Sequence, residues 1–337
     1  MTDFEPAYMR SYRSGLLKQQ ALEAKKRLHS CCLCPRQCNI DRTDRQKTGV
    51  CKTVEKAWVS SYHSHFGEEA PLVGMHGSGT IFFTHCNLLC NFCQNYDISH
   101  LGSGREVTDA QLATMMLSLQ SDGCHNINFV SPSHVIPQIL SAVEIACVRG
   151  LTVPLVYNSG GYDRVETLQL LDGIFDIYMP DFKFWDSGIA EMTCKALDYS
   201  QIASLAIKEM HRQVGDLVID KTGVAQSGLL IRHLVLPEGK AGTREIMRFI
   251  AQEISTNTYV NIMSQYRPCG DVTGIKFLQR SVTASEFMDA LSAAKTEGIT
   301  RLDQPDCSDL KPPSQVEDPE RFYRLGTCNI QDNLKIP

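Results

Sequence analysis

Residues 80–96 read Thr80-Ile-Phe-Phe-Thr-His-Cys-Asn-Leu-Leu-Cys-Asn-Phe-Cys-Gln-Asn-Tyr96, and this stretch decides the fold. Its apolar beginning, Ile81 to Thr84, predicts a short buried strand. A loop follows with three cysteines, Cys86, Cys90 and Cys93, which we call the cysteine triad; residues 86–93 are the triad loop. Thiolates hold iron–sulfur clusters, so the triad can bind three corners of a four-iron cube. The loop has no fourth cysteine, which would leave one iron open to a substrate.

Strands and helices alternate after this loop. We predict further strands at 126–130, 152–157, 175–179, 229–236 and 259–264, and helices at 110–120, 134–149, 163–171, 199–214, 243–254 and 284–296. Such alternation indicates parallel βα units. The sequence therefore predicts an α/β fold, a partial (β/α)6 barrel, whose site lies at the carboxyl ends of the strands.

The loops after the predicted strands are polar, small or charged, as a ligand-lined rim requires. They read Ser131-Pro-Ser-His134, Asn158-Ser-Gly-Gly161 and Pro180-Asp181-Phe-Lys183. Other interpretations remain open for some of these residues. Asp181 and Lys183 could be an ordinary exposed ion pair. Arg232 could pair only with a neighbouring carboxylate, and His134 is interpreted as a helix-start residue rather than a ligand.

A second group of cysteines precedes the first predicted parallel strand. Cys31, Cys34, Cys38 and Cys51, which we call the cysteine quartet, have a spacing that suits a tetrahedral zinc site or an auxiliary iron–sulfur cluster. The spacing of the cysteines does not distinguish a zinc site from an iron–sulfur cluster. Cys32 is a spare thiol or an alternative to Cys31. Four unrelated free thiols are the remaining interpretation, although clustered thiols in a polar loop are prone to oxidation.

We divide the chain into three parts. Residues 1–77 form an N-terminal extension with a helix at 16–29, the cysteine quartet and a strand at 57–66. His63 and His65 share one face of the strand and could be ligands or acid–base groups, although a partly solvated strand face is the commoner explanation. Glu68 and Glu69 follow the strand in what we interpret as a solvated turn. Residues 78–300 form the core, and residues 301–337 form an irregular tail that contains Cys307 and Cys328.

Composition restricts the class of protein. The chain has 14 cysteines in 337 residues and no secretory signal pattern, which indicates metal or redox chemistry in a reducing compartment. Its net charge of −5 predicts no nucleic-acid surface. No apolar run approaches the ~20 residues that cross a bilayer. We therefore expect a cytoplasmic protein without a membrane partner.

The triad loop, the strand before it and the βα units after it resemble the radical S-adenosylmethionine (SAM) enzymes. The resemblance covers about residues 78–297, and the family signature C-x3-C-x-aromatic-C is matched by Cys86, Cys90, Phe92 and Cys93. The segment Asn-Phe-Cys-Gln-Asn at 91–95 is similar to the pyruvate formate-lyase activating enzyme branch. The cysteine quartet is similar to the motif of a subgroup of activating-enzyme-like proteins with N-terminal cysteines.

The resemblance implies an oxidoreductase with a [4Fe–4S] cluster on the triad and SAM on its open iron. Reductive cleavage of SAM would yield a 5′-deoxyadenosyl radical that abstracts hydrogen. It also implies a low-potential electron donor of the flavodoxin or ferredoxin type. The cofactor-binding residues that it implies are Phe92, Ser131, Asn158, Ser159, Asp181, Lys183 and Arg232.

The chain departs from the family pattern in three places. Ser131-Pro-Ser stands where the family has Gly-Gly-Glu, so Ser131 and Ser133 hydroxyls or backbone carbonyls would bind the SAM amino group. Asn158 and Ser159 replace an Asp-Thr pair that helps to hold a cation in the activases, so this chain lacks the carboxylate of that site. Tyr266 stands where the activases have a SAM-contacting histidine.

Three functions follow as hypotheses. The first is an activating enzyme that takes hydrogen from a backbone glycine of a partner protein. The second is a radical SAM enzyme that modifies another peptide, an RNA or a small molecule. The third is a non-catalytic iron–sulfur electron carrier, which would need a fourth cysteine in the triad loop.

Overall fold

A run of six parallel strands lies at the centre of the computed structural model, which describes residues 4–303. Neighbouring strands follow the order of the sequence. They are β2 (Ser78–Phe83), β4 (Ile127–Val130), β5 (Leu155–Ser159), β6 (Ile177–Pro180), β8 (Ala225–Leu234) and β9 (Tyr259–Met263). This is the predicted α/β fold, an open (β/α)6 arrangement with a mostly parallel sheet.

Antiparallel strands extend the sheet. β1 (Ala57–His65) pairs with β2 on one side and with β3 (Arg105–Val107) on the other. The strand predicted at 57–66 is confirmed, and it joins the N-terminal extension to the sheet of the core. β7 (Val218–Ile219) forms a hairpin with β8. The predicted boundary at residue 78 stays a prediction, and the predicted tail lies outside the described residues from 304 onward, with Cys307 and Cys328.

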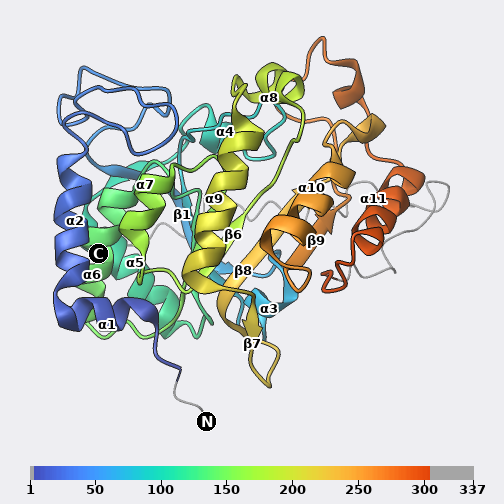
Figure 1. Cartoon of the computed structure of the whole chain (residues 1–337). Helices are drawn as coiled ribbons and strands as arrows, with labels where there is room; N and C mark the ends of the chain where they lie inside the picture. Colours follow the sequence, from blue (N-terminus) through green and yellow to red (C-terminus); the bar gives the residue numbers. More distant parts are fainter. Residues whose placement is uncertain (1–3, 304–337) are drawn as a thin grey trace. The chain divides into compact units, whose positions relative to one another are not determined.

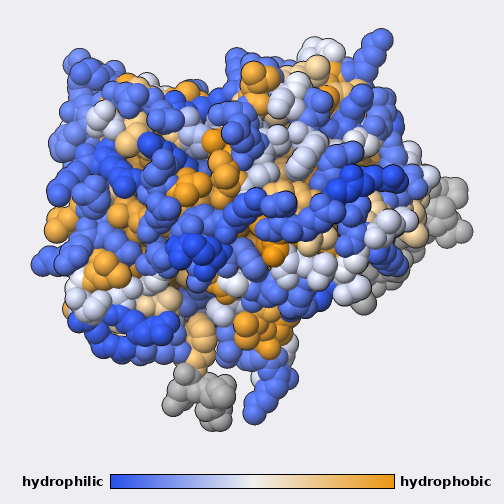
Figure 2. Space-filling model, viewed as in Figure 1, coloured by the Kyte–Doolittle hydropathy of each residue, from blue (hydrophilic) through white to orange (hydrophobic). Residues whose placement is uncertain are grey.

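Helices cover the outer face of the strands (Figure 1). They are α5 (Asp109–Ser121), α6 (Ile136–Val148), α7 (Val165–Leu168) with η1 (Gln169–Leu171), α9 (Tyr199–Val214), α10 (Thr243–Phe249) with η3 (Ile250–Ile254), and α11 (Ala284–Thr296). Their solvent side is mostly hydrophilic, with apolar side chains scattered among charged ones (Figure 2). Among the described residues, no helix has the length and apolar character to span a membrane.

Local chemistry explains where the helices begin. Thr108 opens α5 with a capping box, in which its hydroxyl accepts from the Gln111 N–H and the Gln111 side chain accepts from the Thr108 N–H. Thr283 and Glu286 open α11 in the same way. The helix predicted at 16–29 is α2 (Leu16–Lys26), preceded at Gly15 by a helix that was not predicted, α1 (Ala7–Ser14).

Short elements complete the described part of the chain. They are α3 (Ala70–Val73), α4 (Tyr96–Ser99), α8 (Ser187–Cys194), η2 (Pro237–Gly239) and η4 (Lys276–Gln279).

The two faces of the sheet have different side chains. Strand alternation puts Ile81, Phe129 and Tyr157 on the outer face, where they belong to the main core under the helices. Val156, Ile177, Met179 and Leu230 lie on the inner face and form a smaller apolar cluster with Leu72. The same alternation places Thr80, Asn128 and Asn158 on the inner face, where Asn158 pairs with Val130 and Met179, so this face carries single polar residues among apolar ones.

Candidate active site

The triad loop follows β2 and is held by the loops of neighbouring strands. The Asn87 side-chain amide donates to the Tyr162 carbonyl at 2.7 Å. The Asn91 N–H donates to the Thr193 carbonyl at 2.9 Å. Because these partners lie after β5 and β6, the loop is fixed over the carboxyl end of the sheet, where the sequence predicted a site.

The three thiols of the triad are largely buried. Burial raises the pKa of Cys86 to about 12, although the Leu88 N–H approaches its sulfur at 3.3 Å. A hydrogen bond with the Cys194 thiol, together with burial, raises the pKa of Cys90. Burial and the nearby Cys90 raise that of Cys93. As free thiols the triad is therefore protonated at neutral pH, and iron would bind by displacing protons.

Asp181 and Lys183 form a half-buried ion pair beside the triad. The Lys183 ammonium donates to Asp181 Oδ2 at 2.6 Å, and the two side chains are only 18% and 19% exposed. Burial by itself lowers the pKa of Lys183, but the charges of Asp181 and Cys90 outweigh burial and raise it. The pair is thus not the ordinary exposed pair of the alternative interpretation.

Two glycines allow the loops to meet. Gly161 has φ +75°, and a Cβ there would lie 2.1 Å from the Asp181 carbonyl oxygen. A Cβ on Gly160 would lie 3.2 Å from the Leu88 side chain of the triad loop. Gly161 is therefore needed for the loops after β5 and β6 to come together, and Gly160 leaves room for Leu88 of the triad loop.

Asn158 and Ser159, both predicted to bind the cofactor, lie on opposite faces of β5. Asn158 is buried on the inner face. The Ser159 hydroxyl donates to Asp163 Oδ2 at 2.5 Å, and the Tyr157 hydroxyl donates to Asp163 Oδ1 at 2.8 Å. Ser159 is thus bound to a buried carboxyl on the helix side of the sheet.

Arg232 is held by two carboxylates. Its guanidinium donates to Glu69 at 2.7 and 3.0 Å and also contacts Glu68. Asn261 donates to Glu69 at 2.7 Å. The Glu69 side chain is fully buried, so the solvated turn that we had predicted at 68–69 is wrong. Burial raises the pKa of Glu69, but Arg232 and Asn261 outweigh burial and lower it.

Phe92 lies among aromatic rings. It is 5% exposed and makes edge contacts with Phe184 and Tyr266, with ring centroids 5.8 and 5.9 Å apart. The Tyr266 hydroxyl donates to the Leu278 carbonyl at 2.7 Å. Tyr266 thus packs behind Phe92, and Ser131 lies half-buried just after β4.

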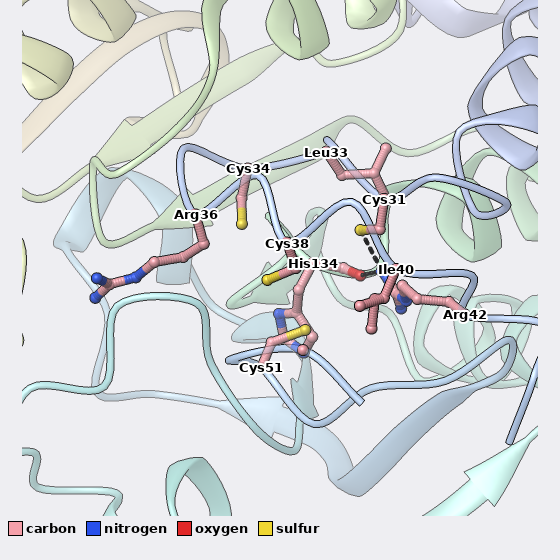
Figure 3. Close-up of a pocket in the computed structure, with 10 residues that line it drawn as sticks. Cys31, Leu33, Cys34, Arg36, Cys38, Ile40, Arg42, Cys51 and His134 are labelled. Carbon is pink, nitrogen blue, oxygen red and sulfur yellow. Dashed lines mark hydrogen bonds between the residues drawn. The ribbon is translucent and has the colours of Figure 1, made fainter. Parts of the chain in front are cut away.

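The cysteine quartet lines one cavity of about 10 Å³ (Figure 3). All four thiols are turned toward this shared space, and the His134 ring lies beside Cys51. Burial and the neighbouring thiols raise the pKa of Cys34 to about 12. Cys32 is not part of the lining. As the side chains are placed, no three or more His, Cys, Asp or Glu residues within 4–303 are arranged to hold a single metal ion.

His134 is buried between the quartet and the triad loop. One ring nitrogen, Nε2, lies 2.9 Å from the Thr84 carbonyl and must donate to it, which leaves Nδ1 without a proton. Burial lowers the pKa of His134 to about 3, so the ring stays neutral. It precedes α6 by two residues, and its position beside the quartet was not predicted.

Comparisons with known proteins give one relative. No protein-family model matches the chain. Over 290 residues the chain is 30% identical to the uncharacterized protein MJ0674 of Methanocaldococcus jannaschii, covering 84% of this chain and 79% of the relative. The chain belongs to the MJ0674 family. A solved structure of HydG, a maturase of the [FeFe]-hydrogenase, aligns with TM-score 0.46 and 11% identity over 65% of this chain. The chain spans about half the length of that structure, 48%.

In this MJ0674-family chain, the predicted site residues separate into two groups. The triad, Asp181 and Lys183 come together at the carboxyl end of the strands, with Arg232 paired to Asp181 through the backbone and Asn158 on the inner face of β5. Ser159 and Arg232 are bound to carboxyls of the protein itself. Sequence reasoning missed Glu69, Thr80 and Asn128, although inner-face alternation along the strands could have indicated the last two.

Proposed function

We propose that this chain is a radical SAM enzyme in which the cysteine triad holds a [4Fe–4S] cluster and the inner face of the sheet binds SAM. One observation carries the proposal. The triad loop sits at the carboxyl end of the first parallel strand, with the Asp181–Lys183 pair of the fourth strand beside Cys90. A metal loop with a fixed cation next to one ligand, at the end of a sheet whose inner face carries a few buried polar residues, is suited to binding a charged cofactor.

The residues present fit the cluster. A four-iron cube is larger than a single ion, so sulfurs that each bind a different corner stand further apart than the ligands of one ion. Buried polar atoms in and next to the triad loop also lack hydrogen-bond partners, among them Asn91 Oδ1, Thr84 Oγ1 and His85 Nδ1. Such atoms cost free energy unless a bound group or water satisfies them.

A cluster held by Cys86, Cys90 and Cys93 and reduced by one electron from a flavodoxin- or ferredoxin-type donor would supply reductive cleavage of SAM to methionine and a 5′-deoxyadenosyl radical able to abstract a hydrogen atom. The residues of the chain prepare the site for this chemistry. The Leu88 N–H points at the Cys86 sulfur and the Lys183 ammonium lies near Cys90, and both favour thiolates over thiols. The aromatic packing around Phe92 excludes water from one side of the loop.

We assign the SAM contacts to the inner face. Asp181 and Lys183 are the charged groups beside Cys90, and Asn158 is a buried polar residue of the inner face. Asn128 joins them, because its Oδ1 is buried without a partner and its Nδ2 makes only a long, 3.5 Å contact with Thr80. Arg232, with its charge compensated by Glu68 and Glu69, acts as a support of the inner face in this assignment.

SAM cleavage tests the proposal directly. Anaerobically reconstituted chain with SAM and a strong reductant should form 5′-deoxyadenosine, and Cys90→Ala should abolish it. Cys147→Ala is the matched control, because Cys147 is also a buried cysteine but lies on α6. Unchanged cleavage in the Cys90→Ala variant would contradict the proposal.

One observation favours the electron-carrier alternative. Cys194 lies against Cys90, so a fourth thiol is present although the triad loop contains none. A fourth cysteine ligand must reach the iron that Cys86, Cys90 and Cys93 leave open. Cys194 instead lies within hydrogen-bonding distance of Cys90, which already binds another iron in this proposal. We therefore expect Cys194→Ala to keep SAM cleavage. A carrier would instead show no cleavage in the parent chain and an altered cluster spectrum in Cys194→Ala.

For the substrate, we propose hydrogen abstraction from a backbone glycine of a partner protein, supported by the similarity of residues 91–95 to the activase branch. Modification of another peptide, an RNA or a small molecule is the alternative. Deuterium at the glycine α-carbon of a candidate partner should appear in 5′-deoxyadenosine. Transfer from another substrate class, with none from glycine, would replace the first assignment by the second.

A further inference from the structure

We propose that the cysteine quartet binds a second metal centre and that Arg36, which lies between two of its cysteines, couples this centre to the triad loop. The shared chemistry of the centre is ligation by four thiolates, as in a zinc site or an iron–sulfur cluster. The four thiols line one cavity but do not stand at single-ion spacing, so binding of zinc requires them to draw closer together. The first half of the proposal is independent of the proposed function. The coupling to the triad rests on it.

The quartet is assembled from two segments that close on one cavity. Cys31, Cys34 and Cys38 come from the first segment and Cys51 from the second, and all line the same space (Figure 3). Gly49 packs so closely that a Cβ would lie 2.8 Å from the Cys38 sulfur. The Val50 N–H points at the same sulfur at 3.5 Å. Backbone N–H groups directed at cysteine sulfur favour the thiolate form that a metal requires.

A buried positive charge next to the quartet supports a metal centre. Arg42 is 1% exposed, and its guanidinium donates to the carbonyls of His134 at 2.8 Å and Val54 at 3.0 Å and approaches the Cys31 sulfur at 3.8 Å. No carboxylate among residues 4–303 pairs with it. A buried cation is costly without a countercharge, and four metal-bound thiolates carry a net negative charge that would supply it.

A second polar group is left unsatisfied at the same cavity. His134 is 1% exposed and lines the space, and its Nδ1 has no hydrogen-bond partner while Nε2 is bound to the Thr84 carbonyl. Thr84 follows β2 immediately before the triad loop. The cavity thus has a free nitrogen lone pair that a water or a metal could use, on a residue that also contacts the root of the triad loop.

Arg36 provides the direct link. Its side chain leaves the turn between Cys34 and Cys38 and is directed away from the cavity (Figure 3). The guanidinium donates to the triad-loop carbonyls of Asn87 at 3.0 Å and Leu88 at 3.2 Å. It also donates to the carbonyl of Cys194 at 2.7 Å and to that of Lys195.

One guanidinium therefore ties the triad loop to the end of α8. Its carbon lies 5.2 Å from the centre of the Tyr162 ring, which adds a cation–π contact. A metal bound by the cysteines on both sides of Arg36 would fix the turn, and the fixed turn would hold the guanidinium in place. Arg36 is in this sense a positioning residue for the triad, because it touches the loop and not the reacting atoms.

The first experiment measures metal content without the triad. In a Cys86→Ala/Cys90→Ala/Cys93→Ala chain purified anaerobically, we expect one residual centre per chain, read as zinc alone or as iron with acid-labile sulfide. Adding Cys34→Ser and Cys38→Ser should remove it, and adding Cys32→Ser should not. A triple variant that retains neither zinc nor iron would overturn the metal site, as would unchanged content after the quartet substitutions.

The second experiment measures coupling in the full chain. Arg36→Gln should leave the quartet metal in place and lower the iron retained by the triad, or shift its electron paramagnetic resonance spectrum. The expected loss is ~10-fold, the lower end of the effect of removing outer-shell partners of a metal site. Arg36→Lys should restore the iron content of the triad only in part, because one ammonium group cannot bond to all the carbonyls that the planar guanidinium contacts. Arg45→Gln is the control, since Arg45 pairs with Glu106 at an exposed site.

A combined variant tests whether the quartet and Arg36 affect the triad through the same contact or independently. If the quartet acts through Arg36, the loss in Cys34→Ser/Cys38→Ser and in Arg36→Gln should not add in the combined variant. Additive losses, or triad spectra unchanged by Arg36→Gln, would overturn the coupling. If the parent chain holds no triad cluster at all, the proposed function fails while the first experiment still decides the quartet.

Discussion

Lys183 Nζ lies 2.6 Å from Asp181 Oδ2, and this pair is placed beside the buried thiol of Cys90. Both residues of the pair belong to the loop after β6, and Cys90 belongs to the loop after β2, so the two loops meet at the carboxyl end of the sheet. The Lys183 ammonium is held by the Asp181 carboxylate, and its positive charge also acts on Cys90 of the triad loop. It therefore links the fold to the chemistry that we propose for the triad.

Removing the charge of Lys183 should make the cluster harder to reduce. We expect Lys183→Met to shift the cluster midpoint potential to more negative values, since a nearby cation stabilises the reduced, more negative cluster. SAM cleavage should fall ~10-fold or more, the usual cost of removing an outer-shell partner. Lys183→Arg, which keeps the charge, should retain most of the potential. An unchanged midpoint potential in Lys183→Met would show that Lys183 pairs with Asp181 but has no electrostatic effect on the cluster.

Gly161 should tolerate no side chain. Gly161→Ala combines a left-handed backbone with a Cβ 2.1 Å from the Asp181 carbonyl, so the loops after β5 and β6 must separate. Gly150→Ala is the matched control, because Gly150 has φ +92° but nothing within 4 Å of a Cβ. Backbone strain alone costs about 1–3 kcal/mol. Denaturant unfolding should therefore show a larger loss for Gly161→Ala than for Gly150→Ala, and equal losses would contradict the close packing.

The order of the strands and the long helices could be predicted from sequence because the signals are local. Strong periodicity and a Thr108–Gln111 capping box lie within a few residues of α5. The helix predicted at 163–171 is instead short α7 followed by a 3-10 turn, η1. Boundaries of this kind depend on tertiary packing, which a local pattern does not contain.

The triad was predictable because its three ligands lie in one loop, whereas long-range partners were not. Arg36 bonds to Asn87 across 51 residues and to Lys195 across 159. Glu69 was misinterpreted because a carboxylate after a strand usually belongs to a turn, and its partner Arg232 lies 163 residues away. The outward direction of Ser159, by contrast, could be predicted. Ser159 is two residues from the apolar Tyr157 on the same strand, so both side chains lie on the outer face.

The Arg232–Glu69 pair should be important for stability. Glu69→Gln leaves a largely buried guanidinium with fewer counter-charges, and we expect a loss of about 3 kcal/mol, reduced to the extent that Glu68 compensates. Glu166→Gln is the control, since Glu166 pairs with Arg164 at 58% exposure and should cost under ~1 kcal/mol. Equal losses in the two variants by urea unfolding would contradict a structural role of the buried pair.

Asp176 should make stability depend on pH. Its carboxylate accepts from the Ala7 N–H at 2.7 Å and the Leu155 N–H at 2.9 Å, yet burial dominates and raises its pKa from 3.8 to about 7. The folded state therefore binds a proton that the unfolded state has already lost between these values. Its contribution to the free energy of unfolding is full below the unfolded pKa and is lost as pH rises toward about 7. Asp176→Asn removes this titration, so urea unfolding measured across that range should show a flatter pH profile in the variant. A profile parallel to that of the parent chain would mean that Asp176 is ionised in the folded protein, held by its two N–H donors.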